Sequence, residues 1–148
     1  METILKHKKK IIVLVLVILI VVGSSGMFSS KTLSNDPLAM VDLSMKMESD
    51  LQLQDVMISE VVGNVLEIRV KDPSVLKEKL DVGTAYIFGY VEPSIGKNIK
   101  TVRVIYTVNN FDVSLFETSL SDISDWTSKK IDDTAFAQKI KFVNLAKK

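Results

Sequence analysis

The chain has 148 residues, no cysteine and a formal net charge of +1 at pH 7. This length fits one small domain with a targeting segment, and the absence of cysteine excludes disulfides, a lipid-modified cysteine and thiolate zinc sites. Arg69 and Arg103 are the only arginines and the lysines beyond residue 10 are scattered among acids, so no basic stripe for nucleic acid exists and no nucleic-acid partner is expected.

The N-terminus carries the most specific signal. Lys8, Lys9 and Lys10 directly precede an unbroken apolar run that begins at Ile11 and ends at Val22. A positive cluster before such a run is typical of an export signal, and it fixes the N-terminus on the cytoplasmic side. A helix over residues 11–28 would rise about 27 Å, close to the ~30 Å of a bilayer core. Residues 1–30 are therefore predicted to be a signal anchor or a signal peptide.

Two forms of the exported protein remain open. The small residues Gly23, Ser24, Ser25 and Gly26 suit a signal-peptidase site, although none of them is alanine. We favour the uncleaved form, a single-pass protein of the cell membrane whose C-terminal domain lies outside. The alternative is a secreted protein. Residues 31–35 are polar and read as a tether, and residues 36–148 are predicted to form one extracytoplasmic domain.

The domain begins with an ambiguous segment over residues 37–49. Asn35, Asp36 and Pro37 form a helix-start signal, with a capping residue before a proline in the first turn. The apolar residues that follow fit both a helical stripe and a strand alternation. We favour a helix because methionine, lysine and glutamate are good helix formers, and a strand is the alternative.

A hairpin is predicted next, with strands over residues 56–62 and 65–71. Gly63 and Asn64 between them accept the positive φ of a tight turn. In the second strand apolar and charged residues alternate strictly, which indicates one buried and one solvent-facing side. The apolar set is Leu66, Ile68 and Val70, and the charged set is Glu67, Arg69 and Lys71.

A central helix is predicted to open at Asp72, Pro73 and Ser74 and to end near Glu92, before Pro93. Its apolar stripe would cover the sheet, and it comprises Leu76, Leu80, Gly83, Ile87 and Val91.

A second hairpin follows, with strands over residues 101–108 and 111–118 around Asn109 and Asn110. Serines and aspartates in residues 119–128 suit helix caps, and Phe136, Ile140 and Val143 form a stripe for a final helix over residues 131–143. The predicted fold class is α+β, with an N-terminal membrane or signal helix. The domain is expected to hold a four-stranded, largely antiparallel sheet of two hairpins, with helices on one face.

The passage DPSVLKEKLDVGTAYIFGYV, followed by TVRVIYTV, a second strand and a short acidic-capped C-terminal helix, resembles small exported or membrane-anchored archaeal proteins. The resemblance covers residues 36–143 and implies an extracytoplasmic α+β domain. It carries no functional residues over to this chain.

Most catalytic arrangements are excluded. The only histidine, His7, precedes the apolar run, so the domain has neither a Ser-His-Asp triad nor a Cys-His dyad. An oxygen-only cation site could be built from Asp122, Asp125, Asp132 and Asp133, but each also suits a helix cap, which is the simpler interpretation. No catalytic residue, metal site or cofactor is therefore predicted.

Trp126, Tyr86 and Tyr90 are the candidate partner contacts, with core or edge packing as their competing interpretation. The favoured function is a non-catalytic, membrane-anchored interaction module that meets a protein partner or another copy of itself through its open sheet face or an edge strand. The alternative is a secreted hydrolase that uses carboxylates only.

Overall fold

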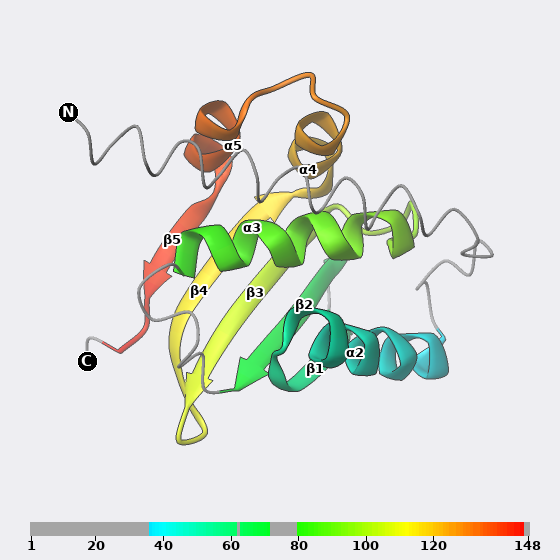
Figure 1. The fold of residues 1–148 in the computed structure, drawn as a ribbon, viewed down its shortest axis with the longest axis vertical. Helices are drawn as coiled ribbons and strands as arrows, with labels where there is room; N and C mark the ends of the chain where they lie inside the picture. The colour runs from blue at the N-terminus through cyan, green and yellow to red at the C-terminus, as the bar shows by residue number, and fades with distance from the viewer. Residues whose placement is uncertain (1–35, 62, 72–79, 147–148) are drawn as a thin grey trace. The chain divides into compact units, whose positions relative to one another are not determined.

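The computed structural model describes residues 36–61, 63–71 and 80–146. These residues form an α+β domain in which one mixed sheet of five strands, in the spatial order β1-β2-β3-β4-β5, is covered by helices on one face (Figure 1). The strands are β1 (Gln54–Val61), β2 (Val65–Lys71), β3 (Thr101–Val108), β4 (Phe111–Ser119) and β5 (Lys141–Asn144). The helices are α2 (Pro37–Leu51), α3 (Leu80–Val91), the short 3-10 helix η1 (Glu92–Ser94), α4 (Leu120–Thr127) and α5 (Asp133–Lys139).

The ambiguous first segment is helical, as favoured from the sequence. The Asp36 side chain caps α2 by accepting a hydrogen bond from the backbone N–H of Leu38 at 3.0 Å, and Pro37 occupies the first turn. Leu43, Ser44 and Met47 are buried, a spacing that belongs to one side of a helix. The strand alternative is therefore wrong.

Both predicted hairpins are confirmed. β1 pairs with β2 and β3 pairs with β4, each antiparallel. The turn residues adopt the positive φ expected of them, with φ values of 94° at Gly63, 62° at Asn64, 50° at Asn109 and 66° at Asn110.

The sheet differs from the prediction in two respects. The two hairpins join through β2 and β3, which run parallel, so the sheet is mixed. The crossover between these strands contains α3, as a parallel connection requires. The predicted start of that helix falls on residues 72–79, which lie outside the described residues.

The prediction of four strands is wrong because a fifth strand, β5, pairs antiparallel with β4. The final helix, expected over residues 131–143, is only the seven-residue α5, and the chain then extends at Lys141. Phe142 lies opposite Phe116 across the two strands, with ring centroids 4.9 Å apart. Pairing with the free edge of β4 supplies backbone hydrogen bonds and ring contacts that no local pattern reveals.

The core lies between the sheet and the helices that cover it. Ile87, Phe88 and Val91 of α3 face the apolar residues of β2 and β3, and the Thr84 and Tyr106 hydroxyls lie 2.8 Å apart within it. On β4 the buried residues are Ser114, Phe116 and Thr118. Leu115 therefore lies on the other face of the sheet, because alternate residues of a strand point to opposite sides.

No helix among the described residues is long and apolar enough to cross a membrane. The predicted membrane segment over residues 11–28 lies outside the described part of the chain, so the signal or anchor stays a prediction.

Candidate functional site: an ion ladder on the uncovered sheet face

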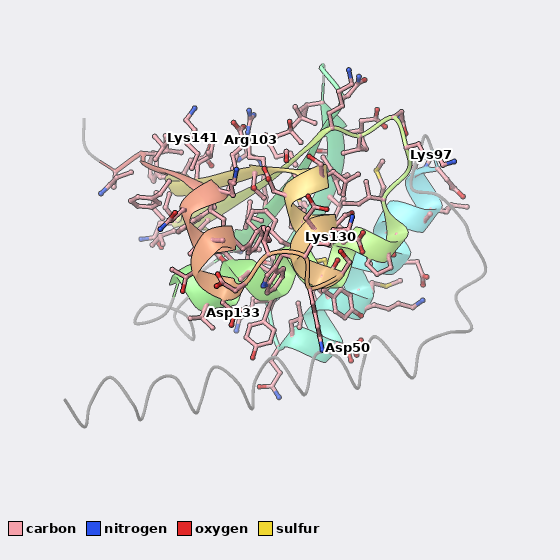
Figure 2. The ribbon with its side chains drawn as sticks, turned by 90° about the horizontal axis from the view of Figure 1, so that it is seen from above. Asp50, Lys97, Arg103, Lys130, Asp133 and Lys141 are labelled. Atoms are coloured by element: carbon pink, nitrogen blue, oxygen red, sulfur yellow. The ribbon has the colours of Figure 1, made fainter. Side chains whose placement is uncertain are left out.

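The sheet face opposite the helices carries an ordered pattern of side chains. In Figure 2, Arg103 and Lys141 lie on the sheet side of the domain, whereas Asp50, Lys130 and Asp133 lie on the helix side. The strand register places one row across all five strands, in which every residue except the serine of β1 is charged: Ser59, Glu67, Arg103, Glu117 and Lys141. We call it the charged row. Its charges alternate in sign from β2 to β5, which is the favourable arrangement for cross-strand neighbours.

A second row runs beside the charged row. It consists of Met57, Arg69, Ile105, Leu115 and Val143, again one residue from each strand. Four of its five members are apolar. The open face therefore offers a line of charges next to a line of apolar side chains.

Two arginines join three carboxylates into one continuous network, which we call the ion ladder. Arg69 donates from Nε to Glu67 Oε1 at 2.9 Å and from Nη1 to Asp112 Oδ1 at 2.7 Å. Arg103 Nη1 lies 3.5 Å from Glu67 Oε2, and its Nη2 donates to Glu117 Oε2 at 2.7 Å. The ladder thus comprises Asp112, Arg69, Glu67, Arg103 and Glu117.

Glu67 is the centre of the ladder. Its side chain is only 11% exposed and lies between the two guanidinium groups. A buried carboxylate is tolerated when it is paired and hydrogen-bonded in this way. For Arg69, burial lowers the pKa, but the hydrogen bonds and charges of Glu67 and Asp112 outweigh burial and leave the pKa above its ordinary value. The ladder is therefore a fixed array of charges.

One apolar residue of the second row is buried. Ile105 is 3% exposed, although it points away from the helices. Its cross-strand neighbours are Arg69 on β2 and Leu115 on β4. Long arginine stems cover apolar surface while keeping their charged ends in water. The apolar centre is thus shielded, whereas Met57 at the end of the second row is 63% exposed.

The sheet edges are less suited to binding. At β1, the backbone N–H of Val56 donates to Glu48 Oε1 of α2 at 2.7 Å, and the register shifts between Gln54 and Met57. Asp55 within this shift has a φ of 45°. Bulges and capping side chains are the usual means of blocking an edge strand. The opposite edge, β5, has only four residues.

The three candidate contacts predicted from the sequence lie on the helical side, apart from the ladder. Trp126 of α4 stacks on Phe136 of α5, with ring centroids 4.4 Å apart and planes 5° apart. The Trp126 indole N–H donates to Asp133 Oδ1 at 2.9 Å. These contacts give Trp126 a packing role between the two C-terminal helices.

Tyr86 and Tyr90 follow each other by one turn on α3. The Tyr90 hydroxyl donates to Asp50 Oδ2 at 2.5 Å and so links α3 to the end of α2. Burial is the first cause that raises the pKa of Tyr90, and the bond to Asp50 adds to it. Burial alone raises the pKa of Tyr86 to about 12, and its hydroxyl has no hydrogen-bond partner among the described residues.

The four aspartates that could have held a cation have other partners. Asp132 caps α5 through Ala135, Asp122 accepts from the Ser119 hydroxyl and Asp125 pairs with Lys130. Asp133 accepts from Trp126. Within the described ranges, no three acidic or histidine side chains gather where they could hold a metal ion.

The ion ladder itself was not predicted. The sequence showed that Glu67 and Arg69 share the solvent-facing side of a strand, and that the chain has only two arginines. What it lacked was the parallel register that sets Glu67 directly opposite Arg103. Sequence periodicity gives the face of a residue, but not its neighbour on a strand joined by a crossover.

A comparison with protein-family models finds no match, and neither curated proteins nor solved structures show significant similarity to the chain. The resemblance to small exported archaeal proteins stays a prediction.

Proposed function

We propose that this chain is a non-catalytic, membrane-anchored extracytoplasmic module that binds a protein partner through the open sheet face. The observation that carries the proposal is the ion ladder beside the second row. Fixed charges next to the exposed Met57 and the half-buried Leu115 and Val143 provide both orientation and apolar contact, the two elements of a protein interface. The protected edge of β1 and the shortness of β5 favour this face over strand addition.

The charge pattern indicates the kind of surface that fits. Three carboxylates and two arginines alternate along the ladder, so a partner with one sign of charge would meet repulsion as well as attraction. A protein surface with alternating charges and an apolar strip matches it best. Arginine is favoured at such sites because its planar fork binds carboxylates in a defined geometry.

The hydrolase alternative has less support. Glycoside hydrolysis requires one carboxyl group that donates a proton. Glu67, Asp112 and Glu117 instead each accept a hydrogen bond from an arginine, so all three are engaged in the ladder.

The decisive experiment is recovery of the partner from native membranes with tagged full-length protein, after brief cross-linking. Arg103→Lys keeps the charge but removes the guanidinium fork. Arg69→Met removes the guanidinium group that donates to Glu67 and Asp112. Loss of a hydrogen-bonded interfacial charge costs about 2 kcal/mol or more, so we expect recovery to fall more than about tenfold.

Lys97→Met is the matched control, because Lys97 is an exposed cation in the loop after η1. It should leave recovery unchanged. Circular dichroism would confirm that each variant is folded. Recovery at the wild-type level with both arginine variants would show that the open face is not the binding surface. Turnover in a hydrolase panel that disappears in Glu67→Gln would support the alternative.

A further inference from the structure

One side of α2 exposes an apolar stripe that no described element covers. Leu38 is 79%, Val41 55% and Met45 57% exposed. Their spacings of three and four residues place them on one side of the helix. The opposite side buries Leu43 and Met47 against the domain. We define Leu38, Val41 and Met45 as the α2 stripe.

The charges on α2 decide between a lipid surface and a protein as occupant. Helices that lie in a membrane interface carry lysine and arginine on their polar face. The described α2 region instead has one lysine, Lys46, against the acids Asp36, Asp42, Glu48 and Asp50. Such a helix would be repelled by anionic headgroups. A protein surface is therefore the better occupant of the α2 stripe.

The stripe is suited to a second copy of the same helix. When two α2 helices cross antiparallel about a two-fold axis, Val41 and Met45 lie near the axis and Leu38 packs toward the far end of the other helix. Asp42 and Lys46, which are joined at 3.0 Å within one chain, border the stripe. The two-fold axis would bring Asp42 of each copy close to Lys46 of the second copy, so the charges are self-complementary.

The small area of the α2 stripe and its position next to the predicted tether determine how strongly two copies would bind. Three side chains offer far less than the ~800 Å² per partner of a stable interface, so the contact would be weak between free molecules. However, α2 begins at Pro37, directly after the predicted tether of residues 31–35. Two anchored copies related by an axis normal to the membrane would hold their tethers at equal height. Confinement in one membrane raises their effective concentration.

We propose that α2 is a homodimer contact, in which the α2 stripes of two anchored copies pack antiparallel. This inference rests on the membrane anchor of the proposed function, but it goes beyond that function because it requires no ligand on the open face. The two surfaces belong to different elements of the domain, so each can fail while the other holds.

The absence of native cysteine allows a direct test with full-length protein in membranes. Val41→Cys and Met45→Cys should each form a disulfide-linked homodimer under mild oxidation. Phe111→Cys is the control, since Phe111 at the β3–β4 turn is an apolar residue that is 75% exposed, more than Val41 or Met45. We expect about tenfold more dimer from either stripe variant than from this control, the ratio that a contact of about 1.4 kcal/mol produces.

Adding Leu38→Glu to the Val41→Cys protein tests whether the α2 stripe, and not another surface of the domain, brings two copies together. Leu38 is largely exposed, so this change should leave the fold intact while reducing the cross-linked dimer about tenfold. Undiminished cross-linking, or equal dimer yields from all three cysteine variants, would overturn the proposal. Cross-linking of the stripe cysteines to a different protein would also overturn it. A fluorophore attached to Met45→Cys that is quenched by a quencher carried on lipid, with no dimer formed, would overturn it too, because the stripe would then contact the membrane.

Discussion

At the scale of single residues, Trp126 is held in place by contacts within the domain. The ring stacks on Phe136, the indole N–H is bonded to Asp133, and Gly89 of α3 leaves room for the ring edge. A glycine in the middle of a helix costs about 1 kcal/mol relative to alanine. Gly89 is therefore tolerated because it permits the close approach of α4.

Gly89→Ala tests this close approach. The new Cβ would lie 3.2 Å from Cζ3 of Trp126, and the ring is held by Phe136 and Asp133. We expect the free energy of unfolding to fall by about 1 kcal/mol despite the gain in helix propensity. Chemical denaturation followed by the fluorescence of Trp126, the only tryptophan, measures it. In a Trp126→Leu background, followed by circular dichroism, the same change should raise stability by about 1 kcal/mol. A stabilising effect in both backgrounds would contradict this role.

Tyr86 gives a prediction at high pH. Its pKa is raised to about 12 by burial, so the folded state keeps the phenol proton at pH values where the unfolded chain loses it. This stabilising contribution is complete below the unfolded pKa of about 10 and is lost as the pH rises toward 12. Unfolding measured at pH 8 and pH 11 should show a smaller alkaline loss in Tyr86→Phe than in the wild type. An equal loss in both proteins would show that Tyr86 does not contribute.

At the scale of elements, short helices depend on their caps. The Ser119 side chain accepts from the backbone N–H of Asp122 at 3.0 Å, and its hydroxyl donates to Asp122 Oδ2 at 2.6 Å. This reciprocal pair ends β4 and starts α4 within one residue. Such a cap is worth about 1 kcal/mol because it satisfies a free N–H at the helix start.

Ser119→Ala should lower the free energy of unfolding by about 1 kcal/mol. Asp125→Ala is the control on the same helix, since it removes only the surface pair with Lys130 and should cost less than about 0.5 kcal/mol. Thermal unfolding of the two variants measures both effects. Equal losses would mean that the surface pair matters as much as the cap.

At the scale of the whole molecule, the prediction concerns the N-terminus. We expect the protein purified from its host membranes to retain Met1, because residues 11–28 are long and apolar enough to nearly span a bilayer. Intact mass and N-terminal sequencing measure this, and extraction at alkaline pH should leave the chain with the membranes. A start at Gly26 or Met27 would instead indicate a cleaved, secreted protein.

Local sequence patterns predicted the structure correctly where the conformation of a segment depends on residues close to it in the sequence. Asp36 and Pro37 indicated α2, and Gly63–Asn64 with Asn109–Asn110 indicated two turns whose positive φ the structure confirms. The extent of the last helix was wrong because residues 141–144 take their conformation from β4. The ion ladder escaped prediction for a similar reason, since its members come from β2, β3 and β4.

The sequence by itself determined the helix caps, the hairpins and the alternation of faces, since each arises from interactions within a few residues. It also shows that residues 36–148 contain neither histidine nor cysteine. Only the tertiary structure decided that the hairpins join in parallel, that residues 141–144 form a strand, and that Arg69 and Arg103 share Glu67. Those outcomes depend on pairing between segments far apart in the chain, whose register is set by the burial of a common core rather than by any local preference.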